Sequence, residues 1–295
     1  MVDLVALYEY ICECFSHKLS ECCQRMSNNH SPAFTDQEVL TIFIYGIMHN
    51  QFTIANIYRF TKKFLSSWFP RLPSYQQFNY RLNRIGHVFP ALIKDLQTYA
   101  TQHDISFDIS LLDSYPIMMA NAKRSEQAKV APLLADKGYC GSKNTYYYGT
   151  KLHVVATKRH GRIPIPEWMG ITPASVHDLV AVREVLVQLE GRKIFADKIY
   201  MDQSFKDELA QNHNIELLTP VKKKPKQERL AFEDGLFSTL VSKVRQPIES
   251  LFNWLDQNTN LQKAHTVRAE AGLIVHVFGR IAAAMLLMLH PDFNS

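Results

Sequence analysis

Three acidic residues lie where a fold could bring their carboxylates together, namely Asp113, Asp197 and Glu249. Asp113 follows the apolar run 109–112, Asp197 follows the short run 193–196, and Glu249 borders the apolar stripe of a predicted helix. Transfer of a phosphodiester requires charge stabilisation on both the attacking and the leaving oxygen, which two divalent cations about 4 Å apart supply. Because such hard cations prefer carboxylate oxygens, these residues favour metal-dependent phosphodiester chemistry, provided that the two strands are neighbours.

Each acid also has an ordinary structural interpretation. Asp113 could be a turn residue before Pro116, and Glu249 could be a solvated helix residue. Asp136 and Asp202 remain alternatives for the second acid. Asp136 is disfavoured because it lies only 23 residues after Asp113 and no buried strand precedes it.

The second half of the chain, 104–295, has the pattern of an α/β domain. Alternating or short apolar runs predict strands at 105–112, 146–157, 163–171, 193–196 and 215–218. Helical spacing is found at 176–189, at 205–212 and from 237 to 290 with a break near Thr259. Three strands, a helix, a strand–helix–strand unit and a helical tail form the order expected of a ribonuclease H-like catalytic domain.

The first half, 1–103, is predicted to be almost wholly helical. Thr35 and Glu38 form a capping-box pattern that opens an apolar helix. A later helix, 74–86, can be capped by Ser74 and resembles the recognition helix of a helix-turn-helix domain. Its polar face carries side chains suited to base edges and phosphates, among them Gln77, Arg81 and Arg84. An ordinary amphipathic helix has a polar face too, so end-sequence recognition by this domain is a hypothesis.

Further residues could assist the acids or contact DNA. Arg245 lies one helical turn before Glu249 and could contact a phosphate or steady a carboxylate. His177 and Asp178 precede a helix, where Asp178 could cap the helix or support the acids indirectly. The basic run Lys222, Lys223 and Lys224 could contact phosphates or be merely solvated.

Composition limits the class of protein. The net charge of +5, with 46% hydrophobic and 21% charged residues, is typical of a globular protein and permits nucleic acid as a partner. The longest apolar candidate, 281–289, is too short to span a membrane, and the N-terminus lacks the layout of a signal peptide. We therefore expect no membrane association and a cytoplasmic location. Five cysteines favour free thiols, although a zinc site near Cys12 and Cys22 is a less favoured alternative.

The chain resembles the DDE-type insertion-sequence transposases, and most closely the 982-type insertion-sequence family. The segments that carry the resemblance are Leu112–Pro116, Tyr148–His153, Ala174–Asp178, Ala196–Tyr200 and Arg245–Glu249. The pattern departs from the family at Ser242, where a Tyr is expected, and at Asp256, where a Lys is expected and Lys263 lies farther along. Asp136 stands in a closer copy of the second-Asp motif, but its position argues against it.

The resemblance implies a transposase that binds two Mg²⁺ (or Mn²⁺) ions per active site through Asp113, Asp197 and Glu249. It would cleave terminal inverted repeats in double-stranded DNA and join the freed ends to target DNA, as a homodimer on DNA. Such a protein would be prokaryotic and associated with the nucleoid when it binds DNA. Two alternatives remain: a catalytically inactive transposase-derived DNA-binding regulator, and a structure-selective ribonuclease H-like nuclease.

Overall fold

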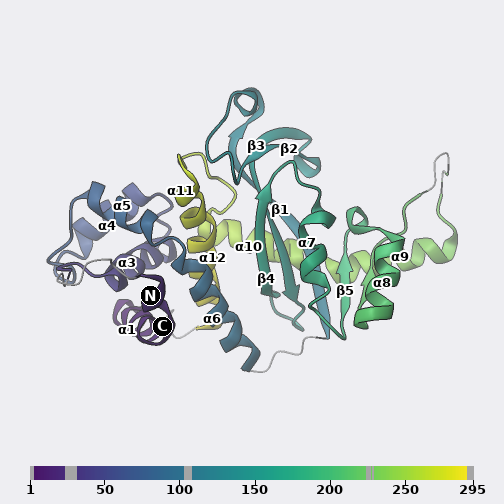
Figure 1. The fold of residues 1–295 in the computed structure, drawn as a ribbon, viewed down its shortest axis with the longest axis horizontal. Helices are drawn as coiled ribbons and strands as arrows, with labels where there is room; N and C mark the ends of the chain where they lie inside the picture. The colour runs from purple at the N-terminus through teal and green to yellow at the C-terminus, as the bar shows by residue number, and fades with distance from the viewer. Residues whose placement is uncertain (1–2, 24–31, 103–107, 224–226, 228, 291–295) are drawn as a thin grey trace. The chain divides into compact units, whose positions relative to one another are not determined.

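The computed structural model describes residues 3–23, 32–102, 108–223, 227 and 229–290 (Figure 1). The chain divides into two compact units, of which unit 1 comprises Met1–His103 with Leu255–Ser295 and unit 2 comprises Asp104–Trp254. The sequence prediction of a helical domain at 1–103 and a catalytic domain at 104–295 remains a prediction, and residues 255–295 group with unit 1 in this division.

The described part of unit 1 is helical. Helix α3 begins at Asp36 because Thr35 and Glu38 form the predicted capping box, in which the Glu38 N–H donates to Thr35 Oγ1 at 3.2 Å. Most of α3 is buried, and α12 packs against both α3 and α6, which explains why the C-terminal residues belong to this unit. Its helical elements are α1 (Leu4–Cys14), η1 (Phe15–Leu19), α2 (Ser20–Cys22), α3 (Asp36–Met48), α4 (Ile54–Phe64), α5 (Tyr75–Arg84), α6 (Val88–Gln102), α11 (Glu270–Ile274), η5 (Val275–Gly279) and α12 (Arg280–Leu289).

Unit 2 is built around one mixed sheet. Its strands are β1 (Ile109–Asn121), β2 (Asp136–Cys140), β3 (Thr145–Thr157), β4 (Ile165–Pro173), β5 (Lys193–Ala196) and β6 (Glu216–Leu218). They lie in the order β2-β3-β1-β5-β6, and β4 pairs with the part of β3 that β2 leaves free. β3 is antiparallel to β1, β2 and β4, whereas β1, β5 and β6 run parallel to one another.

Helices of unit 2 cover both faces of this sheet (Figure 1). On one face, α7 (Asp178–Leu186) and α8 (Gln203–His213) bury an apolar cluster against β1, β3, β5 and β6. On the other face, Tyr115 of β1 stacks on Phe252 of α10 (Pro247–Thr259), with ring centroids 4.9 Å apart. Helix α9 (Phe232–Arg245) packs near β5. Short helical turns η2 (Ala122–Glu126), η3 (Gly141–Lys143) and η4 (Lys198–Tyr200) complete this unit as described.

Two strand predictions require correction. Strand β1 does not end at Leu112, as predicted, but continues to Asn121, because its pairing with β3 extends that far. Pro116 is tolerated there because β5 pairs with β1 only as far as Leu112, so that edge of β1 is open beyond it. Strand β2 was not predicted at all, since its sequence, Asp136-Lys-Gly-Tyr-Cys140, has no apolar alternation.

The C-terminal helix has a longer apolar segment than the sequence analysis considered. Glu270–Leu289 is continuous and, by length and hydropathy alone, could cross a membrane, whereas the sequence prediction considered only 281–289. In the structure 67% of its most apolar window is buried inside the protein. Because α12 packs on α3 and α6, its apolar character is accounted for by the core of unit 1.

Candidate active site

The first two acids are neighbours in the sheet of unit 2. Parallel strands β1 and β5 pair Leu112 with Ala196, so Asp113 and Asp197 are the next residues along each strand. Side chains alternate between the faces of a strand. Leu112 and Ala196 both face the apolar cluster under α7, which places Asp113 and Asp197 together on the opposite face. The two strands are therefore neighbours, which the sequence analysis could only assume.

Helices α9 and α10 bring the third acid to the same face through Arg245. The guanidinium of Arg245 donates to Asp113 Oδ2 at 2.5 Å and to Glu249 Oε1 at 2.7 Å. The sequence predicted one helix through this region, but Pro247 has no N–H and starts a new helix. Gln246 keeps helical backbone angles, so Arg245 and Glu249 remain one turn apart and share a face.

The electrostatics of Asp113 reflect a crowded group of charges. Burial raises the pKa of Asp113 to about 6, the Arg245 guanidinium lowers it, and the nearby charges of Asp197 and Glu249 raise it again. The carboxylate of Asp113 remains 21% exposed and that of Glu249 remains 54% exposed, so solvent or a ligand can reach both.

The chemistry of this donor set fits a hard divalent cation, because added positive charge would relieve the repulsion among three carboxylates. As they stand, no three His, Cys, Asp or Glu side chains within the described residues form a cluster that could hold a metal. Arg245 instead supplies positive charge to two of the three acids. A cation at Asp113 and Glu249 would therefore compete with Arg245 for the same oxygens.

The raised pKa of Asp113 predicts a specific pH dependence of metal-free stability. A carboxyl whose folded pKa exceeds its unfolded value destabilises the fold when ionised, and this penalty is relieved as the pH falls through the folded pKa. With a folded pKa of about 6, the stability of wild type relative to Asp113→Asn should increase by about 1 kcal/mol from pH 7 to pH 5. Denaturant unfolding of both proteins in a chelator would measure this difference, and parallel pH profiles would contradict the cause given for the shift.

The two alternative second acids lie elsewhere or have another role. Asp136 is exposed at the start of β2, which β3 separates from β1. Asp202 caps α8, since its Oδ1 accepts the Phe205 N–H at 3.1 Å, and its other oxygen pairs with Arg183. Neither is among the charges that act on Asp113.

Beneath the opposite face of the sheet lies an ion pair that the sequence reading missed. Lys151 of β3 donates to Asp178 Oδ1 at 2.7 Å and to the Val176 carbonyl at 2.6 Å. Asp178 was expected to cap α7, but His177 does so, with its Nδ1 accepting the Leu179 N–H at 3.3 Å. Both partners stand in the motifs that carried the family resemblance, and that was the available signal.

Tyr200 is a second neighbour of the acids that the sequence reading did not assign. Tyr200 is fully buried, and burial is the largest cause that raises its pKa. The negative charges of Asp113 and Asp178 raise this pKa further. Asp197 contributes in the same direction. The hydroxyl therefore stays protonated beside the acids and can donate a hydrogen bond.

The side chains on α5 that were predicted to bind DNA have unequal access to solvent. Gln77 forms a capping box with Ser74 and uses its Oε1 to accept the Ser74 N–H at 3.2 Å. Arg81 donates to both oxygens of buried Asp36 and also to a backbone carbonyl. Arg84 is exposed and lies against the ring of Tyr80, so it alone of the three presents its charge outward without a carboxylate partner among the described residues.

This difference predicts separable effects of two similar substitutions. Arg81→Gln would leave Asp36 buried without its counter-ion, so the free energy of unfolding should fall by about 3 kcal/mol. Arg84→Gln should leave stability unchanged and reduce DNA affinity roughly tenfold if α5 reads DNA. Thermal melting and DNA titration of both variants would separate these effects, and loss of affinity without loss of stability in Arg81→Gln would contradict the structural role.

The remaining predicted contacts and departures lie on the surface or near it. Lys222 and Lys223 are exposed after β6, and Lys224 lies outside the described residues. Ser242 is exposed on α9, and Lys263 is exposed as well. Asp256 accepts the Gln262 N–H at 2.9 Å, so the residue found at the expected Lys position has a local structural role.

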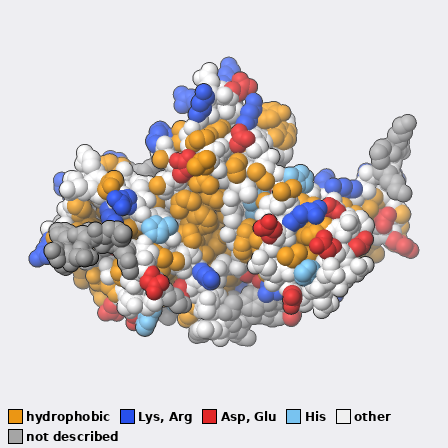
Figure 2. All heavy atoms as spheres, viewed as in Figure 1, with side chains coloured by type: hydrophobic (Ala, Val, Ile, Leu, Met, Phe, Trp, Pro, Cys, Tyr) orange, Lys and Arg blue, Asp and Glu red, His pale blue; other side chains and the backbone are white. Residues whose placement is uncertain are grey.

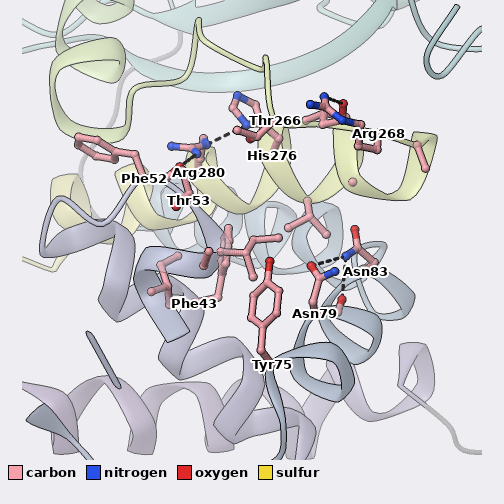
Figure 3. A pocket seen from close by; sticks show the side chains of 17 residues that line it. Phe43, Phe52, Thr53, Tyr75, Asn79, Asn83, Thr266, Arg268, His276 and Arg280 are labelled. Atoms are coloured by element: carbon pink, nitrogen blue, oxygen red, sulfur yellow. Dashed lines mark hydrogen bonds between the residues drawn. The ribbon is translucent and has the colours of Figure 1, made fainter. Parts of the chain in front are cut away.

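A cavity of about 540 Å³ lies within unit 1 and none of the three acids lines it (Figure 3). At its wall Arg280 donates to the Phe52 carbonyl, the Thr259 carbonyl and His276 Nδ1, and His276 Nε2 contacts the Leu261 carbonyl at 2.9 Å. Burial lowers the pKa of Arg280 to about 10 and that of His276 as well. Because these groups bind backbone carbonyls, we assign them a structural role.

Comparison with known proteins adds one finding. Residues 104–269, more than half of the chain, match the family of the transposase DDE domain. No curated protein and no solved structure was found to match. The matched segment contains the paired strands β1 and β5 and the helices that carry Arg245 and Glu249. The chain therefore belongs to the family of transposases that have this DDE domain.

Proposed function

We propose that this transposase cleaves the ends of its element and transfers them to target DNA with Asp113, Asp197 and Glu249 as the acidic triad. One observation carries the proposal: β1 and β5 pair so that Asp113 and Asp197 leave adjacent strand positions on one face, to which Arg245 joins Glu249. Asp113 is buried, and the charges of Asp197 and Glu249 raise its pKa further; a perturbed carboxyl beside other acids favours a catalytic use.

Asp113, Asp197 and Glu249 would hold two Mg²⁺ or Mn²⁺ ions. Bound ions would supply charge stabilisation at the attacking and leaving oxygens of the phosphodiester. Arg245 compensates Asp113 and Glu249 in the protein alone, and after giving up Asp113 its guanidinium could bind a DNA phosphate. Tyr200 would keep its proton near the acids.

The sheet of unit 2 supports a ribonuclease H-like fold for this domain, with four strands in antiparallel pairing, β1 to β4, followed by β5 and β6, which run parallel to β1 and are each preceded by a helix. The helical residues 1–103 would bind the terminal inverted repeats, with exposed Arg84 as the predicted cationic contact on α5. Membership of the 982-type group and a homodimer on DNA rest on the motif resemblance and remain part of this proposal.

The test is cleavage and joining of a duplex that carries the inverted repeats flanking the coding sequence, with Mg²⁺ or Mn²⁺ and with a chelator. We expect metal-dependent cutting at the repeat ends and covalent joining to a second duplex. Binding to the repeats without cutting would support the alternative that the protein is a catalytically inactive DNA-binding regulator. The observation that favours this alternative is the pairing of Arg245 with two of the acids. Cutting without preference for the repeats, and without joining, would support a structure-selective nuclease.

A further inference from the structure

Basic and aromatic side chains gather at the end of unit 2 formed by β2, β3 and the turns beside them. Residues 121–146 contain five Lys or Arg and two Asp or Glu, so this short stretch carries +3 of the chain's net charge of +5. Figure 2 shows Lys and Arg side chains around this projection, which stands at the top of the view. We call this surface the β2–β3 tip; its exposed members are Lys123, Arg124, Lys129, Lys137, Tyr139, Lys143 and Tyr146.

The positive charges of the tip are incompletely neutralised by the protein. Of the two acids, Glu126 pairs with Lys137 at 3.3 Å, and both side chains are largely exposed. The carboxylate of Asp136 accepts the Lys137 N–H, and a hydrogen bond with Ser175 lowers its pKa. Lys123 and Arg124 form no ion pair with any side chain that the structure describes. An exposed pair contributes little to stability, so the excess charge is available to an anionic partner.

Two exposed tyrosines lie among the cations of the tip. Tyr139 and Tyr146 are each more than half exposed, yet their rings lie 5.2 Å apart and the Tyr139 hydroxyl donates to Asn144 Oδ1 at 2.5 Å. The Lys137 ammonium lies 5.2 Å from the centre of the Tyr146 ring. Exposed aromatic rings beside cations are found on surfaces that contact nucleic acid.

We propose that the β2–β3 tip binds the phosphate backbone of the DNA duplex that occupies the active site, at a distance set by β1. Asp113 and Asn121 lie eight residues apart on β1, and a strand that rises about 3.3 Å per residue spans roughly 26 Å over that length. Since duplex DNA rises about 3.4 Å per base pair, the tip would contact phosphates roughly eight base pairs from the bond at the acids. Only this distance rests on the proposed catalytic site, because phosphate binding by the tip does not require catalysis.

The experiment measures the affinity of the full-length protein for a fluorescein-labelled duplex by anisotropy over a series of KCl concentrations. Each lost phosphate contact should reduce the slope of log affinity against log salt by about 0.9. We expect Lys123→Ala/Arg124→Ala to reduce the slope by about 1 to 2 and to weaken binding roughly tenfold at moderate salt. The matched control, Arg162→Ala/Lys193→Ala, removes the same charge from exposed positions of the same unit and should leave the slope unchanged.

An unchanged slope in the tip variant, or equal changes in both double variants, would overturn the proposal. Melting temperatures equal to that of wild type would show that the variants are folded. Repeating the titration in an Asp113→Asn background keeps this test independent of the catalytic proposal, because phosphate binding should persist there. Phosphate-ethylation interference on the element's end would then test the spacing, and a tip-dependent contact next to the cleaved bond would contradict the geometry.

Discussion

Replacing Asp113 or Asp197 by Asn should reduce metal-dependent DNA cleavage by at least about a thousandfold while leaving DNA binding within a fewfold of wild type. The two residues leave adjacent positions of β1 and β5, so each Asn removes a negative ligand from the same site without removing volume. Single-turnover cleavage of an end-labelled duplex, at protein concentrations that saturate binding, would measure the chemical step. Glu249→Gln should behave in the same direction.

The matched control for this prediction is Asp136→Asn. Asp136 stands in a sequence that resembles the second-Asp motif, but it is exposed on β2, and β3 separates it from β1. Its substitution should leave the cleavage rate within a fewfold of wild type. A thousandfold loss in Asp136→Asn together with normal cleavage by Asp197→Asn would reverse the assignment of the second acid.

The part of the site that could be predicted was carried by short motifs and by local patterns. Asp113 and Asp197 could be recognised as candidates because each directly follows a short apolar run, and such a run predicts a buried strand. The capping box of Thr35 and the helix cap at Ser74 are confirmed for the same reason, since donor and acceptor are three residues apart. These features depend on neighbours along the chain.

Contacts between segments that are far apart in the sequence could not be predicted from such local patterns. Arg245 was placed near Glu249 from helical spacing, but its ion pair with Asp113 joins residues 132 positions apart. Arg81 was predicted to contact DNA from its place on the polar face of a helix, and the sequence did not show that it pairs with Asp36. Strand β2 pairs with β3 but has no alternating apolar pattern of its own, so the sequence did not predict it.

Breaking the ion pair between Lys151 and Asp178 should produce one of the largest losses of stability that a single substitution in unit 2 can cause. Both side chains are mostly buried, with 18% and 8% exposure. Lys151→Met would leave the Asp178 carboxylate buried without its counter-ion and the Val176 carbonyl without its donor. We therefore expect the free energy of unfolding to fall by about 3 kcal/mol or more, measured by denaturant titration.

Two comparisons would show that the loss comes from an uncompensated charge. Lys193→Met breaks a pair with Glu216 in which both side chains are more than half exposed, so it should cost less than about 1 kcal/mol. Adding Asp178→Asn to Lys151→Met should recover part of the loss, because the amide carries no charge. If Asp178→Asn recovered no stability, the loss would come from the missing packing of the lysine side chain. The ion pair would then not explain why both residues stand in the motifs that carry the family resemblance. Recovery of stability would instead assign the two motifs a shared role: Lys151 on β3 holds the segment that leads into α7, and α7 packs against Leu112 and Ala196, the residues that immediately precede the two aspartates.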